Sequence, residues 1–198
     1  MYSVWMPVLA YLIGSVPTGY LLSSVSGIDI REAGSGNIGA TNVGRVVGWK
    51  AGLLTLIADA GKGFIPVFFS VQLGFDPKVS ALTALAVFIG HLYPVFLKFK
   101  GGKGVATAIG CLAGLDPLIA GCLILVFLVI ALVTRWVSLG SLSAAALAPM
   151  LFWFFSYESP TIWMAMIMAI LIFVRHRGNI QRLISGGESK FEIRQRGG

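Results

Sequence analysis

Val105-Ala-Thr-Ala-Ile-Gly-Cys-Leu-Ala-Gly-Leu-Asp-Pro117 decides the fold, because its apolar run is too short to cross a membrane alone. A perpendicular span needs about 20 apolar residues, whereas a helix over residues 105–115 rises only about 16 Å. The run is therefore either a half-length helix buried against its neighbours or the first half of a kinked helix that continues through Asp116-Pro117. The first alternative gives seven membrane segments, and the second gives six.

The composition places the rest of the chain in a membrane as well. Of 198 residues, 57% are hydrophobic and only 12% are charged, and the mean hydropathy is +0.86. A soluble domain of this size does not carry so much apolar surface. The apolar runs lack the alternation of strands, so we predict helices. The predicted segments are residues 4–25, 49–73, 79–97, 105–115, 117–133, 141–155 and 160–174.

The positions of lysine and arginine favour seven segments. With seven, all but two of the 15 Lys and Arg residues lie on one side of the membrane. The exceptions are Lys62, which lies inside a segment, and Lys78, which lies on the opposite side. Because cytoplasmic loops carry an excess of Lys and Arg, we predict an all-α integral membrane protein with about seven transmembrane helices, its N-terminus outside and its C-terminus cytoplasmic.

Residues 1–198 are expected to form a single polytopic membrane domain, to which a short basic cytoplasmic tail at 175–198 belongs. The net charge of +7 is explained by basic residues next to the bilayer, so no nucleic acid is expected as a partner. Cys111 and Cys122 lie in apolar segments without metal-ligand companions and are interpreted as packing residues. No metal and no cofactor are predicted.

A glycine-rich motif, Gly34-Ser-Gly-Asn-Ile-Gly-Ala-Thr-Asn-Val-Gly-Arg45, follows the first segment and is predicted to form a loop. Glycines allow several backbone N–H groups to approach one anion. Ser35, Asn37, Thr41 and Asn42 add side-chain partners, and Arg45 adds charge with bidentate geometry. The motif matches the dinucleotide fingerprint, but a membrane helix precedes it instead of a strand, so a dinucleotide fold is not indicated.

Three further polar elements fall on the same predicted side. Lys98-Phe-Lys-Gly-Gly-Lys-Gly-Val-Ala-Thr107 leads into the short helix, whose first turn offers free N–H groups to an anion. Arg175-His-Arg-Gly-Asn-Ile-Gln-Arg182 continues to Glu188 after the last segment, and Ser138-Leu-Gly-Ser141 follows Arg135. We predict that the four elements build one composite phosphate-binding site.

Two charged residues, Asp59 and Lys62, lie inside the second segment. A lone charge at that depth costs at least about 2.5–3.5 kcal/mol. Residues three apart share one helix face, so we predict a structural ion pair, with an ion or proton path as the alternative. His91 is interpreted as a hydrogen-bonded packing residue, whereas His176 lies among polar neighbours and is a functional candidate.

The three longer motifs together resemble the signature blocks of the bacterial acyl-phosphate-dependent glycerol-3-phosphate acyltransferases, and the resemblance covers essentially the whole chain. It implies transfer of a fatty acyl group from acyl phosphate to the 1-hydroxyl of glycerol 3-phosphate, giving lysophosphatidic acid and phosphate. It also implies a multi-pass protein of the bacterial inner membrane whose active site faces the cytoplasm.

The resemblance implies roles for single residues. Ser35 and Arg45 would be a catalytic pair, and His176 and Asn179 would be catalytic or would orient the substrate. Gly101, Gly102, Lys103 and Gly104 would bind glycerol 3-phosphate, and Glu188 would be structural, as we also expect of Asp59 and Lys62. From the chemistry alone we add Gly34, Gly36, Asn37, Gly39, Thr41, Asn42 and Ser141 as donors to a phosphate or to the developing oxyanion.

An acyl phosphate carries a good leaving group, so direct attack by the substrate hydroxyl needs no acyl-enzyme. Two bases match this step: His176, with an unperturbed pKa of about 6.5, and the substrate phosphate, with a second pKa of about 6. We prefer the substrate phosphate. We predict that Ser35 donates a hydrogen bond, and a covalent role for Ser35 is the competing hypothesis.

A transporter or channel for a phosphorylated solute is the alternative from a different class. The basic loops and the buried charged pair suit it, but the two halves of the chain show no internal repeat, and the motifs gather on one face. Two partners stay open for the tail after Glu188, namely anionic lipid of the bilayer and a soluble enzyme that produces acyl phosphate.

Overall fold

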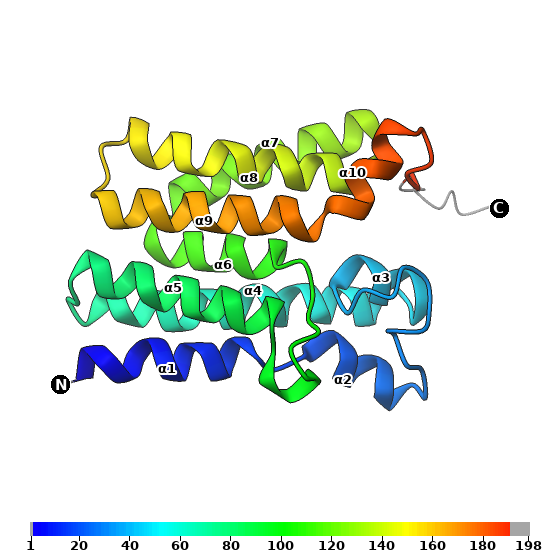
Figure 1. The fold of residues 1–198 in the computed structure, drawn as a ribbon, viewed down its shortest axis with the longest axis horizontal. Helices are drawn as coiled ribbons and strands as arrows, with labels where there is room; N and C mark the ends of the chain where they lie inside the picture. The colour runs from blue at the N-terminus through cyan, green and yellow to red at the C-terminus, as the bar shows by residue number, and fades with distance from the viewer. Residues whose placement is uncertain (1, 191–198) are drawn as a thin grey trace.

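The computed structural model describes residues 2–190, and all regular elements in this range are helices. They are α1 (Tyr2–Gly14), α2 (Thr18–Val25), α3 (Ala40–Val46), α4 (Trp49–Gln72), α5 (Pro77–Leu92), the short 3-10 helix η1 (Val95–Leu97), α6 (Val105–Leu115), α7 (Pro117–Thr134), α8 (Val137–Phe154), α9 (Ser159–Arg175) and α10 (Arg177–Ile184). The long helices lie side by side in one bundle (Figure 1). The last part of the predicted basic tail, residues 191–198, lies outside the described residues.

Each of the seven predicted segments is helical. Within residues 2–190, five stretches are long and apolar enough to cross a membrane: Trp5–Val25, Trp49–Gln72, Pro77–Leu97, Pro117–Thr134 and Val137–Phe154. A sixth span is obtained if α9 and α10, which meet at an angle of 61°, are taken together. The seventh segment is α6, which has only 11 residues.

The chain reverses direction at Asp116, so α6 and α7 are separate helices and the alternative of one kinked span is excluded (Figure 1). Asp116 has an extended backbone, with φ −149° and ψ 106°. Its carboxylate accepts the N–H groups of Leu118 and Ile119 at 2.7 and 3.2 Å. Pro117 occupies the first helical position, where no N–H is needed. The half-length helix predicted near 105–115 is therefore a separate element.

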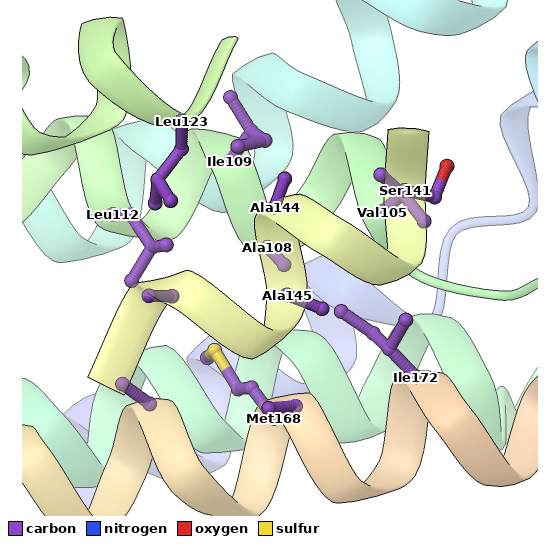
Figure 2. A pocket seen from close by; sticks show the side chains of 13 residues that line it. Val105, Ala108, Ile109, Leu112, Leu123, Ser141, Ala144, Ala145, Met168 and Ile172 are labelled. Carbon is purple, nitrogen blue, oxygen red and sulfur yellow. The ribbon is translucent and has the colours of Figure 1, made fainter. Parts of the chain in front are cut away.

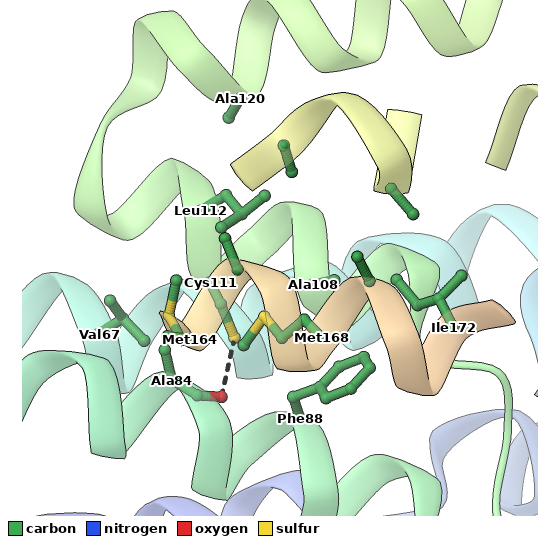
Figure 3. Packing of buried hydrophobic residues seen from close by; sticks show 14 of the residues in the cluster. Val67, Ala84, Phe88, Ala108, Cys111, Leu112, Ala120, Met164, Met168 and Ile172 are labelled. Atoms are coloured by element: carbon green, nitrogen blue, oxygen red, sulfur yellow. Dashed lines mark hydrogen bonds between the residues drawn. The ribbon is translucent and has the colours of Figure 1, made fainter. Parts of the chain in front are cut away.

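Glycine contacts hold α6 tightly against α4. A β-carbon added to Gly110 would lie 2.0 Å from the carbonyl oxygen of Ala60, and one added to Gly63 would lie 2.3 Å from that of Thr107. Small residues allow such close approach between helices in lipid, where packing rather than the hydrophobic effect drives association. Side chains from α5, α6 and α9 fill the adjoining core, and the Cys111 thiol donates to the Ala84 carbonyl at 3.6 Å (Figure 3).

Two local predictions are wrong. The segment 4–25 is not one helix, because α1 ends at Gly14 and α2 begins at Thr18. Pro17, at this break, has no N–H to continue the helical hydrogen bonds. The second half of the glycine-rich motif is not a loop, since residues 40–46 form α3, with the Gly39 carbonyl accepting the first N–H groups.

The polar motifs gather at one end of the bundle. The elements α2, α3, α10 and the turn between η1 and α6 lie at the right of Figure 1. The α4–α5, α6–α7 and α8–α9 turns, which carry Asp76, Asp116 and Glu158, lie at the left. The four elements predicted to form one site thus occupy a single end of the molecule.

Gly110→Ala should lower the midpoint of thermal unfolding of the purified protein in detergent, followed by tryptophan fluorescence. The added methyl group must displace the backbone of α4, and overpacking of this kind costs about 1–3 kcal/mol. Gly121→Ala, on α7, is the matched control, because no heavy atom lies within 4 Å of its added β-carbon. Equal midpoints for the two variants would contradict the close contact of α4 and α6.

Candidate functional site

The glycine-rich motif folds around the side chain of Asn42, which is only 3% exposed. Its Oδ1 accepts the N–H of Ser35 at 2.9 Å, and its Nδ2 donates to the carbonyls of Ala33 and Asn37 at 3.0 and 2.9 Å. The side chain of Asn37 in turn accepts the N–H of Gly39 at 3.0 Å. The predicted ligand role of Asn42 and Gly39 is therefore corrected, since both are bonded within the motif and brace it.

The groups that the motif leaves at its surface are few. Ser35, Thr41 and Arg45 are exposed, and Gly34 and Gly36 adopt φ values of +61° and +70°, a region that favours glycine. Ser35 precedes α3, and Arg45 lies in its last turn. Among the described residues no hydrogen bond joins this motif to the other motifs, so its link to them is the charge of Arg45, which acts on Lys103.

The two glycines that follow Lys100 are tied to the backbone on both sides. The N–H groups of Gly101 and Gly102 donate to the carbonyls of Leu92 and His91 at 3.1 and 3.2 Å. Arg175 donates to both glycine carbonyls, to that of Gly102 at 3.1 Å. The N–H groups of Gly101 and Gly102 are therefore not free to bind an anion, and these two residues shape the turn.

The free donors lie one step further along the chain, at the beginning of α6. Among the described residues, the backbone N–H groups of 103–107 have no protein partner, and no side chain caps the helix. Gly104 precedes α6 with φ +84°. Unbonded N–H groups and the positive end of the helix dipole make such a terminus an anion-binding site. As predicted, the first turn of this helix offers free N–H groups, which here belong to residues 103–107.

Lys103 completes this site with a positive charge. Its ammonium group donates to Oδ1 of Asn179, on α10. Burial lowers the pKa of Lys103; Glu188 acts against this effect, while Arg182, Arg175 and Arg45 add to it, and the pKa reaches about 8. An anion that pairs with this ammonium would stabilise its charged form.

Asn179 is itself held by Glu188, so that a chain of hydrogen bonds supports Lys103. Oε1 of Glu188 accepts from Asn179 Nδ2 at 2.6 Å and from Ser138 Oγ at 2.7 Å, and Oε2 accepts from Arg182 Nε at 2.8 Å. Partial burial raises the pKa of Glu188, but these hydrogen bonds outweigh it and leave the pKa below its ordinary value. The carboxylate is therefore ionised at neutral pH and fixes the amide of Asn179.

His176 joins α9 to α10 and is 3% exposed. Its Nδ1 lies 2.8 Å from the Ile172 carbonyl, so we assign the proton to Nδ1 and the acceptor lone pair to Nε2. Burial and the nearby Lys103 lower the pKa of His176 to about 4. The Ile172 carbonyl and Glu188 raise this pKa, but their effect is smaller. The imidazole is neutral at pH 7 and acts as a hydrogen-bond acceptor.

An apolar pocket extends along α6 from the anion site. It lies between α6, α7, α8 and α9, and Figure 2 shows Val105 and Ser141 together at one side of it and Leu112 and Leu123 at the other. Six of its 13 lining residues are alanine, so short apolar side chains form much of its wall. The hydroxyl of Ser141 donates to its own helix at 2.9 Å, so its predicted role as a donor to a ligand is corrected to that of a lining residue.

Two residues in direct contact with the site were not singled out from the sequence. Arg175 belongs to the third motif but could be read as a topology signal, and Ser138 belongs to the short fourth element. A cation next to a predicted helix end was the available signal for Arg175. Within residues 2–190, no group of three or more His, Cys, Asp or Glu residues is placed to hold a metal ion.

Known proteins resemble this chain over nearly its whole length. Residues 4–186 match the family described as glycerol-3-phosphate acyltransferase. The glycerol-3-phosphate acyltransferase of Trichlorobacter lovleyi is 49% identical over 184 residues, which cover 92% of this chain and 94% of the relative. That of Aquifex aeolicus is 43% identical over 192 residues, which cover 96% and 100%.

Two solved structures are also similar. Both are crystal structures of PlsY (YgiH), an integral membrane glycerol 3-phosphate acyltransferase, in its glycerol 3-phosphate and its lysophosphatidic acid forms. The first has a TM-score of 0.95 and 42% identity, and the second has 0.92 and 41%. Each comparison covers 97% of this chain and 96% of the other.

Glu188→Gln should loosen α10, because the two carboxylate oxygens of Glu188 accept hydrogen bonds from Asn179 and Arg182. A glutamine side chain replaces one of these oxygens with an NH2 group, which would face a donor and cannot accept its hydrogen bond. A hydrogen bond to a charged group contributes about 1.5–3 kcal/mol, so amide hydrogen exchange over residues 178–184 should rise by about 10- to 100-fold. Glu158→Gln is the control, since the side chain of Glu158 makes no capping bond to α9. Unchanged exchange in Glu188→Gln would show that α10 does not depend on this carboxylate.

Proposed function

Since the chain belongs to the integral membrane glycerol-3-phosphate acyltransferase family, we propose that it transfers a fatty acyl group from acyl phosphate to the 1-hydroxyl of glycerol 3-phosphate. The products are lysophosphatidic acid and inorganic phosphate. One observation carries the proposal: the anion site at the beginning of α6 adjoins an apolar pocket. The glycerol 3-phosphate and lysophosphatidic acid forms of PlsY support it. The alternative of a transporter or channel is set aside by family membership.

The phosphate of glycerol 3-phosphate binds to the ammonium of Lys103 and the free N–H groups of residues 103–107. Asn179 and Glu188 hold that ammonium in place, and Gly101 and Gly102 set the direction in which the turn approaches α6. Two phosphates must be bound at once, and Arg45 supplies the second cation at this end of the bundle, for the phosphate of the donor. Ser35, Thr41 and the backbone of Gly34, Gly36 and Asn37 contact the same phosphate.

The acyl chain occupies the pocket between α6, α8 and α9. Its carbonyl carbon then lies near Val105, where the pocket meets the anion site. In this position the 1-oxygen forms a bond to the acyl carbon as the bond from that carbon to the phosphate oxygen breaks. Ser35 donates a hydrogen bond and is not acylated.

The proton of the attacking hydroxyl passes to the phosphate of glycerol 3-phosphate. A catalytic base works best when its pKa lies near the working pH. With a pKa of about 4, His176 is a weaker base than a phosphate monoester, whose second pKa is about 6. His176, whose Nε2 is a hydrogen-bond acceptor, orients the substrate instead.

The protein is a multi-pass integral membrane enzyme, and we place its active site on the cytoplasmic face of the bacterial inner membrane. The basic turns lie at one end of the bundle, and the turns with Asp76, Asp116 and Glu158 lie at the other. The positive-inside rule assigns the basic end to the cytoplasm and the N-terminus to the outside. A soluble enzyme that produces acyl phosphate would then deliver the donor directly to the site.

Purified protein in lipid should release phosphate only when acyl phosphate and glycerol 3-phosphate are both present. Arg45→Ala should reduce kcat/KM by about 100-fold or more, because it removes a charged donor to the reacting groups. Lys50→Ala is the matched control, an exposed cation at the same end of the bundle. Phosphate release without glycerol 3-phosphate would overturn direct transfer, and faster reaction with an acyl thioester would overturn the assigned donor.

The pH dependence of kcat/KM for glycerol 3-phosphate should report Lys103. The ammonium carries its charge below its pKa of about 8 and loses it as the pH rises through that value, so kcat/KM should fall above pH 8. The Lys103→Arg variant keeps its positive charge, because a guanidinium has a pKa above about 12. The alkaline fall in kcat/KM should therefore move beyond the measurable pH range in this variant. The same alkaline fall in both proteins would assign the titration to another group.

A further inference from the structure

Three buried titratable residues lie next to the site and have no part in the proposed reaction. Asp59 and Lys62 on α4 and His91 on α5 are 2%, 8% and 4% exposed. We propose that they form a strut that fixes the turn Gly101-Gly102 and so determines where glycerol 3-phosphate binds. They are then positioning residues, and the inference rests on the proposed binding of the phosphate at Lys103 and residues 103–107.

The predicted ion pair forms, and it also bonds to a third element. Lys62 Nζ lies 2.8 Å from Asp59 Oδ1 and donates to the Val16 carbonyl, also at 2.8 Å. Thr18 Oγ1 donates to the same carboxylate oxygen. Val16 and Thr18 flank the break between α1 and α2. The pair, which belongs to α4, is therefore also bonded to the chain between α1 and α2. These bonds give the pair a fixed position in the bundle.

His91 connects this pair to the turn. Its Nδ1 lies 3.6 Å from Asp59 Oδ1, so the ring packs against the carboxylate at a distance too long for a hydrogen bond. On the other side, a β-carbon added to Gly102 would lie 2.3 Å from His91 Nε2. The His91 carbonyl also accepts the N–H of Gly102 at 3.2 Å. The ring and the backbone of one residue thus both contact the turn.

Arg175 holds the turn from the opposite direction. Its guanidinium donates to the carbonyls of Gly101 and Gly102 and lies 5.7 Å from the ring of Tyr93. The turn is consequently held between His91 and Arg175. Lys103 is the next residue, and α6 begins two residues later. A shift of the turn would therefore displace the ammonium and the free N–H groups together.

A pair that served only to neutralise itself would not need these contacts. Replacing a buried ion pair by apolar residues is often neutral or stabilising, so stability alone does not explain the presence of this pair in the bundle. His91 Nδ1 has no hydrogen-bond partner among the described residues, although the atom is buried. The prediction that His91 is a hydrogen-bonded packing residue does not fit this observation. A ring packed between the Asp59 carboxylate and the turn does fit it.

The test compares Michaelis constants for the two substrates in the full-length protein in lipid. His91→Ala should raise KM for glycerol 3-phosphate at least 10-fold and leave KM for acyl phosphate within twofold. His91→Gln, which restores a planar polar group, should recover most of the loss. Thr83→Val is the matched control on the same helix, because the buried hydroxyl of Thr83 bonds only to the Val79 carbonyl.

A second variant keeps the test decisive if His91→Ala does not fold. Asp59→Asn combined with Lys62→Met removes the charged pair together and leaves no single buried charge. It should fold, as judged by its thermal midpoint, and show the same selective rise in KM. A lower midpoint with both Michaelis constants unchanged, or with both raised equally, would reduce the three residues to a structural role and overturn the proposal.

Lys103→Ala separates this inference from the proposed binding site. If Lys103→Ala raises KM for glycerol 3-phosphate and the strut variants do not, only the strut is wrong. If Lys103→Ala also leaves that KM unchanged, the phosphate does not bind at the beginning of α6, and both assignments fail.

Discussion

The contact between α4 and α6 is the constraint on which the site depends. Gly63 and Gly110 bring the two backbones together, and this contact fixes the position of α6, which has only 11 residues, along the bundle. Its first N–H groups then face the polar end of the molecule, and its side chains face an apolar pocket. One short helix therefore presents free N–H groups and the wall of an apolar pocket within a few residues of each other.

Much of this arrangement follows from sequence patterns, because those patterns reflect local or averaged properties. Apolar run lengths and the placement of Lys and Arg predicted the seven helical segments, and the spacing of Asp59 and Lys62 predicted their ion pair. Asp116-Pro117 is a helix-start signal, and it separates α6 from α7 as such signals do. What these features share is that each depends on near neighbours in the chain or on the bilayer.

The errors concern partners that are distant in sequence or that a motif supplies to itself. Glycine spacing predicts that a backbone can turn sharply, but not where its N–H groups will be bonded. The N–H groups of Gly101 and Gly102 donate to carbonyls at the end of α5, and the side-chain amide of Asn42 is hydrogen-bonded within its own motif. Burial is equally invisible at this level, and it is burial that lowers the pKa of His176 to about 4.

The turn at Gly101 and Gly102 also has a consequence for how this protein can vary. A β-carbon at residue 101 would lie 2.1 Å from the His91 carbonyl, and one at residue 102 would meet the His91 ring. Neither position has room for a side chain, although neither N–H group is free to touch a ligand. The two glycines are thus constrained by a buried neighbour, His91, and their tolerance of mutation depends on how the helices of the bundle pack.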